Sequence, residues 1–267
     1  MNESVEVISA VRRSDRALVE QLSEWESLEF GVAHTSPRHP ALASANQLRE
    51  VWLADVSPEA AYERAESYYS ERGLTCRLWT PASGQAVEPV ERLLLSRGWR
   101  AWDRAAMYLA SMDALTDAMP PAIRILPARA MPKAYRQTFA AEGAAANADP
   151  GVAGAAADAQ AEAAIDRLND SDHDAFVAIV DGAAAGRITY LQAGDIARLD
   201  DITVLRAFRG QGVGGALVSH VLHLAKRLLP KIIVATAPAD CPERIGFLRG
   251  WCFEIGGVVR DFVRPPI

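Results

Sequence analysis

The sequence predicts a mixed α/β (α+β) protein of two similar halves, each with a mixed sheet flanked by helices. Three observations predict this class. Strand and helix patterns alternate along the chain, the frame E-R-x-x-x-x-R-G-W at residues 91–99 recurs at 243–251, and polar residues with a Pro-Pro pair at Asp113–Pro121 separate the two copies. Each copy reads as a strand, a helix, a strand, a short helix and a final strand. We therefore predict one domain at residues 1–115 and a second at 122–267.

Composition places the chain among ordinary soluble globular proteins. Half of its 267 residues are hydrophobic and 23% are charged, enough for two cores of ordinary size. The net charge of -6 argues against a nucleic-acid partner and mildly favours cationic small molecules. No signal-peptide core and no run of 18 apolar residues occurs, so we expect a cytoplasmic protein without membrane contact. The cysteines form no C-x-x-C pair, which predicts neither a disulfide framework nor a zinc site: Cys76, Cys241 and Cys252.

The elements of the first half follow from capping residues and apolar spacing. A helix capped at Ser14 is expected to open it, with an apolar face of Leu18, Leu22, Trp25 and Leu28. The other elements are expected in this order: a strand near Gln47–Ala54, a helix begun by Ser57-Pro58, a strand at Cys76–Pro81 and a short helix ended by Gly98.

The second half gives stronger signals. Alanine makes up fourteen of the 28 residues from Ala140 to Arg167, which predicts helical segments with a break at Asp149-Pro150-Gly151. The remaining elements are expected in this order: a strand at Ala122–Leu126, strands at Asp174–Val180 and Ala185–Leu191 joined by an Asp181-Gly182 turn, a strand at Ala197–Leu205, a helix at Val213–Leu229, and a buried strand at Lys231–Ala237 parallel to Ala197–Leu205.

The most informative feature is the glycine-rich turn between that last strand and helix, Arg209-Gly210-Gln211-Gly212-Val213-Gly214-Gly215. Glycines let backbone N–H groups approach a ligand, and a helix N-terminus adds positive potential, so the turn predicts a pyrophosphate socket. It also matches the dinucleotide pattern G-x-G-x-x-G. Only 52 residues follow Gly215, however, and the strand at 231–238 has no acidic ribose partner. No G-K-[ST] follows, which argues against a P-loop, and a purely structural turn remains the alternative.

Arg209-x-x-Gly212-x-Gly214 resembles the Q/R-x-x-G-x-G/A signature of the GCN5-related N-acetyltransferase (GNAT) superfamily. The order of hairpin strands, signature, helix, buried strand, short helix and Gly-aromatic pair is similar to that family over residues 122–267. The first half has only Ala54-Asp55-Val56-Ser57-Pro58 at the matching place. The whole chain therefore resembles a tandem GNAT protein with a degenerate first copy. The resemblance implies mostly antiparallel sheets with a parallel strand pair at the cofactor cleft.

The resemblance implies acetyl-CoA as cosubstrate and no metal. The N–H groups of Gly210 to Gly215, with Arg209, would hold its pyrophosphate; this set is Arg209, Gly210, Gln211, Gly212, Val213, Gly214 and Gly215. The backbone of Ile202, Thr203 and Val204 would pair with the pantetheine arm, and an N–H there would stabilise the oxyanion. An acceptor amine then attacks the thioester directly and needs a base.

Asp200 and Asp201 are the candidate bases, because they adjoin the cofactor strand. Alternation along a strand would send them to opposite faces, so that only one lines the cleft, with Asp200 slightly favoured by the resemblance. The alternative is that both are solvated or held in hydrogen bonds. Family members often have a tyrosine as proton donor about four residues before the Gly-aromatic pair; Gly246 stands there. Tyr190 is the candidate substitute, against an ordinary core or surface tyrosine.

Other polar residues give weaker signals. His220 and His223 fall opposite the apolar face of their helix and are expected at the surface. Asp240 or Cys241 is expected to cap the last helix, ahead of Pro242. The alanine-rich segment and its continuation are acidic apart from Arg167, which suits either an acceptor pocket for a cationic molecule or an exposed helix with a polar connector: Glu142, Asp149, Asp158, Glu162, Asp166, Asp170, Asp172 and Asp174.

Together these observations predict an acyltransferase that moves an acetyl group from acetyl-CoA to a primary amine. The acceptor is expected to be a small cationic molecule, or a lysine or N-terminal amine, with no nucleic acid or membrane as partner. The chain is expected as a monomer or a homodimer. The alternative is a non-catalytic acyl-CoA-binding or regulatory protein of the same fold. A nicotinamide-dependent enzyme is disfavoured by the short remainder after the turn.

Overall fold

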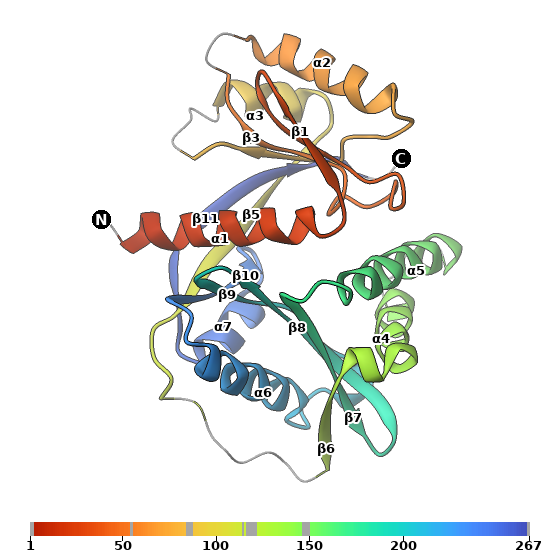
Figure 1. Cartoon of the computed structure of the whole chain (residues 1–267), viewed down its shortest axis with the longest axis vertical. Helices are drawn as coiled ribbons and strands as arrows, with labels where there is room; N and C mark the ends of the chain where they lie inside the picture. Colours follow the sequence, from red (N-terminus) through yellow and green to blue (C-terminus); the bar gives the residue numbers. More distant parts are fainter. Residues whose placement is uncertain are drawn as a thin grey trace. The chain divides into compact units, whose positions relative to one another are not determined.

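A computed structural model describes residues 3–53, 56–83, 88–113, 115, 122–145 and 150–265 (Figure 1). It is a mixed α/β protein, as predicted. The helices are α1 (Glu3–Glu20), α2 (Pro58–Ser70), α3 (Glu88–Ser96), α4 (Pro132–Ala145), α5 (Pro150–Arg167), α6 (Val213–Leu228) and α7 (Pro242–Arg249), with 3-10 turns η1 (Ala128–Ala130) and η2 (Arg206–Phe208). The strands are β1 (Glu24–Leu28), β2 (Gly31–Thr35), β3 (Gln47–Val51), β4 (Leu78–Pro81), β5 (Arg100–Leu109), β6 (Ile123–Pro127), β7 (His173–Val180), β8 (Ala183–Ala193), β9 (Ile196–Val204), β10 (Ile232–Pro238) and β11 (Phe253–Val263).

The chain forms two compact units that each take segments from both halves of the sequence. Unit 1 comprises Met1–Ser14, Ala106–Ala237 and Cys241–Gly257, and unit 2 comprises Asp15–Ala105, Pro238–Asp240 and Val258–Ile267. The sequence placed one boundary between residues 115 and 122, whereas the first fourteen residues lie in the unit of the second half and the last ten in that of the first. Local sequence patterns do not indicate that the two ends of the chain join the unit of the other half.

The strand pairing repeats in the two units, as the duplicated sequence frame predicts. In unit 2, β3 leads through α2 to β4, which pairs with it in parallel. In unit 1, β9 leads through α6 to β10, again in parallel. The strand order is β1-β2-β3-β4-β11-β5 in unit 2 and β11-β5-β10-β9-β8-β7-β6 in unit 1. β4 therefore pairs with the end of β11, and the two copies have exchanged their final strands.

The core of unit 2 lies between its sheet and the helices α2 and α3. Ser57 caps α2 by accepting a hydrogen bond from the Ala60 N–H at 3.2 Å, as predicted. Gly98 ends α3 with φ +82°, and the N–H of Trp99 donates to the Leu94 carbonyl at 3.0 Å. The indole of Trp99 packs edge-on against Trp79, with ring centroids 6.3 Å apart.

The expectation of a helix capped at Ser14 is wrong. α1 begins at Glu3, and Ser14 lies within it, with its hydroxyl donating to the Val11 carbonyl at 2.9 Å. A serine can satisfy its hydroxyl within a helix in this way, so its presence alone does not mark a helix start. Trp25 and Leu28, assigned to the same helical face, lie on β1, which pairs with β2.

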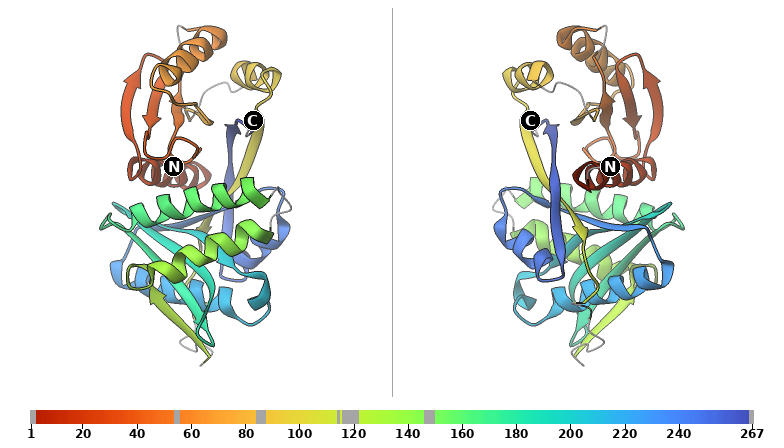
Figure 2. Two further views of the ribbon diagram at one scale, coloured as in Figure 1. Left: turned by 90° about the vertical axis from the view of Figure 1, so that its right-hand side faces the viewer. Right: turned by 90° about the vertical axis from the view of Figure 1, so that its left-hand side faces the viewer.

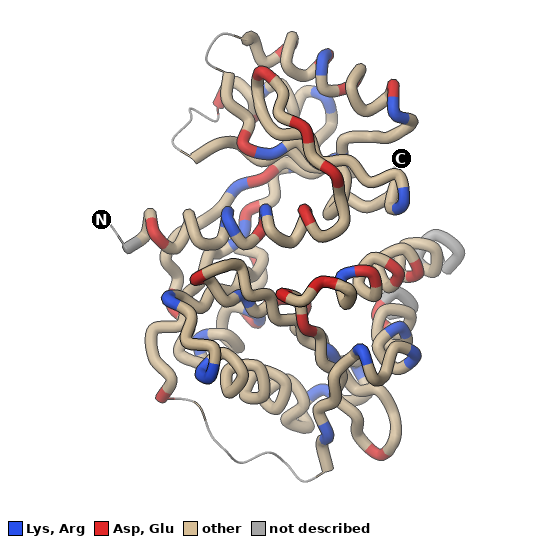
Figure 3. The backbone as a smooth tube through the Cα atoms, in the orientation of Figure 1, with Lys and Arg blue, Asp and Glu red and all other residues tan. Residues whose placement is uncertain are grey.

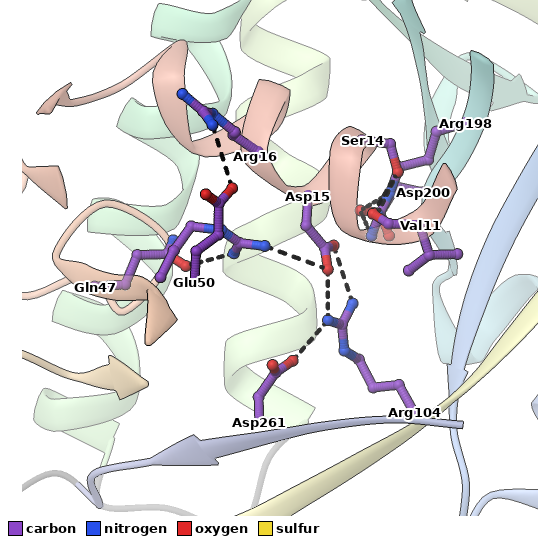
Figure 4. Close-up of polar contacts among 11 residues, drawn as sticks. Val11, Ser14, Asp15, Arg16, Gln47, Glu50, Arg104, Arg198, Asp200 and Asp261 are labelled. Atoms are coloured by element: carbon purple, nitrogen blue, oxygen red, sulfur yellow. Dashed lines mark hydrogen bonds and ion pairs between the residues drawn. The ribbon is translucent and has the colours of Figure 1, made fainter. Parts of the chain in front are cut away.

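A buried ion network holds the end of β11 in unit 2 (Figure 4). Arg104 donates to both oxygens of Asp15, at 3.1 and 2.7 Å, and to Asp261 at 2.7 Å. Next to it, Phe262 is fully buried opposite Trp79 and belongs to the core of α2 and α3. The last strand of the chain thus completes the core of unit 2.

We expect Phe262→Ala to destabilise unit 2 by about 3–5 kcal/mol, because it removes a buried ring and leaves a cavity. Urea denaturation followed by tryptophan fluorescence measures this, since five of the six tryptophans lie in unit 2. Val258→Ala on the same strand is the matched control, because Val258 is 53% exposed. Equal denaturation midpoints for the two variants would contradict this assignment of the core.

Two buried histidines make stability depend on pH. Burial, then the charge of Arg49, lowers the pKa of His34 to about 4, and burial, then Arg167, lowers that of His173 to about 4. Both groups are neutral in the folded chain while the unfolded chain takes up protons near pH 6.5. Their contribution is therefore complete above pH 6.5 and falls as the pH drops to 4.

We expect the free energy of unfolding to fall by about 3 kcal/mol per histidine between pH 7 and pH 4. Urea titrations at a series of pH values measure this slope. The double variant His34→Gln/His173→Gln should flatten it, whatever its stability at pH 7. A slope equal to that of the unmodified chain would rule the two histidines out as its source.

In unit 1, helices cover both faces of the sheet (Figure 2). One face of β7 packs against α4 and α5 through Ala175, Val177 and Ile179. The other face packs against α6, where Phe176 meets His220 edge-on with ring centroids 4.6 Å apart. His220, expected at the surface, is thus half-buried, and burial lowers its pKa.

The alanine-rich segment forms α4 and α5, with Asp149 outside the described residues. Small alanines let α5 approach α4 closely, since Ala161 and Ala164 pack with Tyr135 and Phe139 in one cluster. Acidic residues recur along α5 and the turn that follows (Figure 3), and Asp158 and Glu162 of α5 are exposed. The hairpin of β7 and β8 has the predicted turn, with φ +49° at Asp181 and +80° at Gly182. Among the helices of the described residues, none is both long enough and apolar enough to cross a membrane.

Candidate functional site

The parallel strands β9 and β10 separate at the centre of unit 1. They are paired from Ile196 opposite Ile232 to Leu199 opposite Ala235. Beyond this point β9 continues to Val204 and β10 to Pro238, with no pairing between them among the described residues. The backbone of residues 200–204 therefore has one unpaired edge. An extended ligand can bind to such an edge as an added strand.

A β-bulge lies where the strands separate. Thr189 of β8 is opposite Asp200, and Arg187 is opposite Thr203, so that Ile188 faces two residues of β9. Asp201 has φ +48°, and its N–H donates to its neighbour, the Asp200 carboxylate, at 3.0 Å. The extra residue breaks the alternation of side chains. The prediction that Asp200 and Asp201 face opposite sides is therefore wrong, because both lie on the face covered by α4 and α5.

Asp201 is held by a buried arginine. The Nε of Arg187 donates to Asp201 at 2.6 Å, and the Thr203 hydroxyl donates to it at 3.2 Å. The other nitrogens of Arg187 donate to α4, to Thr138 at 3.2 Å and Glu142 at 2.5 Å. Burial raises the pKa of Asp201, and Arg187 opposes that shift. Arg187 thus connects the bulge to α4.

Asp200 is held by a second buried arginine, Arg198 (Figure 4). The Nε and Nη2 of Arg198 lie 3.2 and 3.0 Å from one carboxylate oxygen of Asp200. The side chain of Arg198 is 3% exposed, while that of Asp200 is 36% exposed. Of the two carboxylates at the bulge, Asp200 combines the greater exposure with a fixed orientation.

Tyr190 lies apart from both carboxylates. It stands opposite Leu199, one residue along from the Thr189–Asp200 pair, so its side chain points to the α6 face of the sheet. Its hydroxyl donates to the Gln192 side-chain oxygen, and burial raises its pKa to about 12. The structure therefore brings Asp200 and Asp201 together and leaves Tyr190 on the other face.

The glycine-rich turn follows directly after the unpaired edge of β9. Gly210 and Gly212 have φ +76° and +80°, and the first hydrogen bond of α6 runs from the Ala216 N–H to the Gly212 carbonyl at 3.0 Å. In the described part of the chain, the N–H groups of residues 210–215 have no backbone partner. They lie at the positive end of the α6 dipole, where an anion is stabilised.

The side chains of the turn brace it from within. The Nε of Arg209 donates to the Val204 carbonyl at 3.2 Å, and the Gln211 amide donates to the Ala207 carbonyl at 3.0 Å. Both side chains therefore help to fix the turn that carries the free N–H groups.

Two aromatic residues that the sequence did not assign to the site border the turn. A Cβ added to Gly214 would meet the Phe247 ring at 3.3 Å, and one added to Gly215 would meet Trp251 at 3.5 Å. Because Gly214 and Gly215 have no side chains, the aromatic residues of α7 and the turn after it can pack against the first turn of α6. Gly246 stands where the family tyrosine is expected, with Phe247 next to it and 37% exposed. In the sequence, only the repeated frame at 243–251 indicated that Phe247 and Trp251 belong to the site.

Cys241 takes the capping position of α7, without a side-chain cap bond, and Pro242 begins the helix. Its sulfur lies 3.6 Å from a Glu243 carboxylate oxygen.

The matching strands of unit 2 stay paired instead of separating. Leu48 is opposite Trp79, Val51 is opposite Pro81, and the Val51 carbonyl accepts a hydrogen bond from the Ala82 N–H at 3.1 Å. The register of this parallel pair shifts between Leu48 and Val51, and Glu50 has φ +53°, close to the φ of Asp201 in β9. Residues 54 and 55, where the sequence lacks the socket, lie outside the described residues.

Comparisons with known proteins agree with this geometry. Residues 145–248 match the acetyltransferase (GNAT) family. A conserved protein of unknown function from Staphylococcus epidermidis is 14% identical with a TM-score of 0.69, over 92% of this chain and 95% of that one. A GCN5-related N-acetyltransferase from Kribbella flavida is 13% identical with a TM-score of 0.63, over 97% and 96%. A tandem GNAT protein from the clavulanic acid biosynthesis pathway is 17% identical with a TM-score of 0.51, over 89% and 80%.

No curated protein sequence matches the chain. The family match covers the separated strands, the glycine-rich turn and most of α7, and the solved structures share the arrangement of the whole chain. The chain therefore has the tandem GNAT fold, and its residues 145–248 match the model of the acetyltransferase (GNAT) family.

Proposed function

We propose that unit 1 binds acetyl-CoA and transfers its acetyl group to a primary amine. The observation that carries the proposal is the run of unpartnered N–H groups at residues 210–215, placed directly after the unpaired edge of β9. The turn suits a pyrophosphate, and the edge at Ile202, Thr203 and Val204 suits the amide-bearing pantetheine arm. The two features follow one another along β9 and α6, as the two parts do in coenzyme A.

Acetyl-CoA supplies the acetyl group as a thioester. An N–H of the Ile202–Val204 edge donates to the thioester oxygen, where negative charge develops during attack. Asp200, through a water molecule, accepts the proton that the ammonium group must lose before its nitrogen can attack. The C–N bond then forms, the C–S bond breaks, the new amide nitrogen releases its remaining extra proton to solvent, and the departing thiolate takes up a proton from solvent. Asp201, paired with Arg187 and Thr203, shapes the bulge that aims these groups.

The acceptor we propose is a small cationic amine. Glu142 and Asp200 are partly exposed on the α4 and α5 face of the bulge, with side-chain exposures of 44% and 36%. Further acidic residues follow along α5 (Figure 3), of which Asp158 and Glu162 are exposed. Such a surface attracts a cation and repels polyanions, and the net charge of -6 adds to the same preference.

Unit 2 is proposed to bind no coenzyme A. Its parallel strands remain joined by the Val51–Ala82 hydrogen bond, so β3 offers no free edge at the place where β9 does. In this proposal the first copy keeps the fold and has lost the cofactor site.

The test is release of free thiol when the protein is mixed with acetyl-CoA and a panel of amines that includes polyamines, aminoglycosides and lysine peptides. We expect release with at least one cationic acceptor. Silence across the panel, with acetyl-CoA bound, would instead support a non-catalytic acyl-CoA-binding or regulatory protein. That second candidate is favoured by Gly246 in place of the family tyrosine and by the arginine partners of both carboxylates.

A further inference from the structure

We propose that helix α1 is part of the active centre of unit 1, with Ser14 as a positioning residue that acts on Asp200 through Arg198. The inference rests on the proposed role of Asp200 as the base. It assigns a task to the N-terminal segment, which precedes the family match at 145–248 by more than a hundred residues.

The first link runs from α1 to β9 (Figure 4). The Ser14 hydroxyl donates to the Val11 carbonyl at 2.9 Å and accepts from Nη1 of Arg198 at 3.0 Å. Ser14 is fully buried, so no water competes for its hydroxyl. The single hydroxyl proton of Ser14 goes to the Val11 carbonyl, so the oxygen can only accept from Arg198. The donor and the acceptor of each hydrogen bond in this series are therefore fixed.

The second link runs from Arg198 to Asp200. With Nη1 on Ser14, the guanidinium presents Nε and Nη2 to one oxygen of Asp200, at 3.2 and 3.0 Å. The other carboxylate oxygen accepts the Asp201 N–H at 3.0 Å. Both carboxylate oxygens are thus held by hydrogen bonds while the side chain remains 36% exposed. Holding a catalytic group in one orientation is what surrounding hydrogen bonds contribute to rate.

The remaining contacts of α1 fix its position on unit 1. Glu6 pairs with Lys231 at 3.0 Å, and Arg13 pairs with Asp195 at 2.8 Å. Between these pairs, a Cβ on Gly256 would lie 2.6 Å from that of Val7, so the glycine lets α1 sit directly against β11. Ser14 therefore reaches Arg198 from a docked helix whose register is set at several points.

The test compares Ser14→Ala and Arg198→Met with the control Arg13→Gln. The control also removes a contact between α1 and unit 1, but one that is 59% exposed on the arginine side and does not reach Asp200. We expect Ser14→Ala to lower kcat about 3- to 10-fold and Arg198→Met about 10- to 100-fold, as for other losses of orientation. The KM for acetyl-CoA should stay within about twofold, because the turn is untouched. Arg13→Gln should retain kcat, because the Glu6–Lys231 pair and the contact of Val7 with Gly256 still hold α1 on unit 1.

Ser14→Thr keeps the hydroxyl and should therefore retain most of kcat. If Ser14 served only to pack α1, the hydroxyl would not matter and Ser14→Ala would retain kcat as well. A kcat for Ser14→Ala equal to that of Arg13→Gln would overturn the inference. So would a Ser14→Ala loss that Ser14→Thr fails to restore although both variants unfold at the same urea concentration.

A second readout separates this inference from the proposed function. With aspartate labelled by ¹³C at the carboxyl carbon, the Asp200 resonance is assigned by its loss in Asp200→Asn. It should move in Ser14→Ala and stay in place in Arg13→Gln. If no amine is acetylated, the proposed function fails, and a moved resonance then still supports the link. An unmoved resonance overturns the link whether or not the protein is active.

Discussion

Gly212→Asp is expected to abolish acetyl-CoA binding by unit 1. Gly212 has φ +80°, a conformation that other residues rarely adopt, and it caps α6 among the free N–H groups of the turn. An aspartate there adds strain, bulk and a negative charge where the pyrophosphate is proposed to lie. We expect binding at least about 100-fold weaker, equivalent to roughly 3 kcal/mol, in isothermal titration calorimetry.

Gly182→Asp is the matched control for this variant. Gly182 lies in the turn between β7 and β8, has the same φ of +80°, and a side chain there would meet nothing within 4 Å. It therefore carries the same backbone strain without approaching the glycine-rich turn. Unchanged binding by Gly182→Asp is expected. Undiminished binding by Gly212→Asp would exclude the turn as the cofactor site.

Asp200→Asn is expected to lower kcat about 10²- to 10⁴-fold, the usual contribution of a positioned general base. The amide keeps the shape of the side chain but cannot accept the proton of the ammonium group. The KM for acetyl-CoA should be unchanged, since that cosubstrate is proposed to bind along β9 and the turn. Steady-state kinetics with the best amine of the panel measure both constants.

Asp201→Asn is the companion variant. It removes the charge that faces the buried guanidinium of Arg187, so its main effect should be on stability. A larger fall in kcat for Asp201→Asn than for Asp200→Asn, at equal stability, would reverse the assignment of the base.

The sequence predicted those parts of the fold that depend on neighbouring residues. The helix from Val213 and the turn at Asp181-Gly182 follow from apolar spacing, glycines and capping residues, and each is confirmed. The parallel pairing of β9 and β10 is also confirmed, since a short, continuous apolar run after a helix is typical of a buried parallel strand.

The features that the sequence could not predict depend on residues far apart in the chain. A bulge requires knowledge of the partner strand, so alternation alone gave Asp200 and Asp201 opposite faces. The exchange of the final strands depends on which edges are free after folding, and no local pattern records it. Ser14 looked like a helix cap because serine serves both there and inside helices, where its hydroxyl can bond back to the preceding turn.

The duplicated frame predicted that the two copies share a topology, and the parallel pairs β3–β4 and β9–β10 confirm it. Their difference lies in a few backbone hydrogen bonds. The Val51 carbonyl is taken by Ala82 in unit 2, whereas β9 has no partner on β10 beyond Leu199 within the described strands. Composition and spacing do not distinguish an open pair of strands from a closed one.

Calorimetric titration of the unmodified chain with acetyl-CoA counts the coenzyme A sites of the chain. One molecule should bind per chain, in unit 1, and Gly212→Asp should remove that binding while Gly182→Asp retains it. A stoichiometry of two, or one molecule still bound by Gly212→Asp, would contradict the assignment of the only working coenzyme A site to unit 1. If no acetyl-CoA bound, the proposal of a coenzyme A site in unit 1 would be wrong.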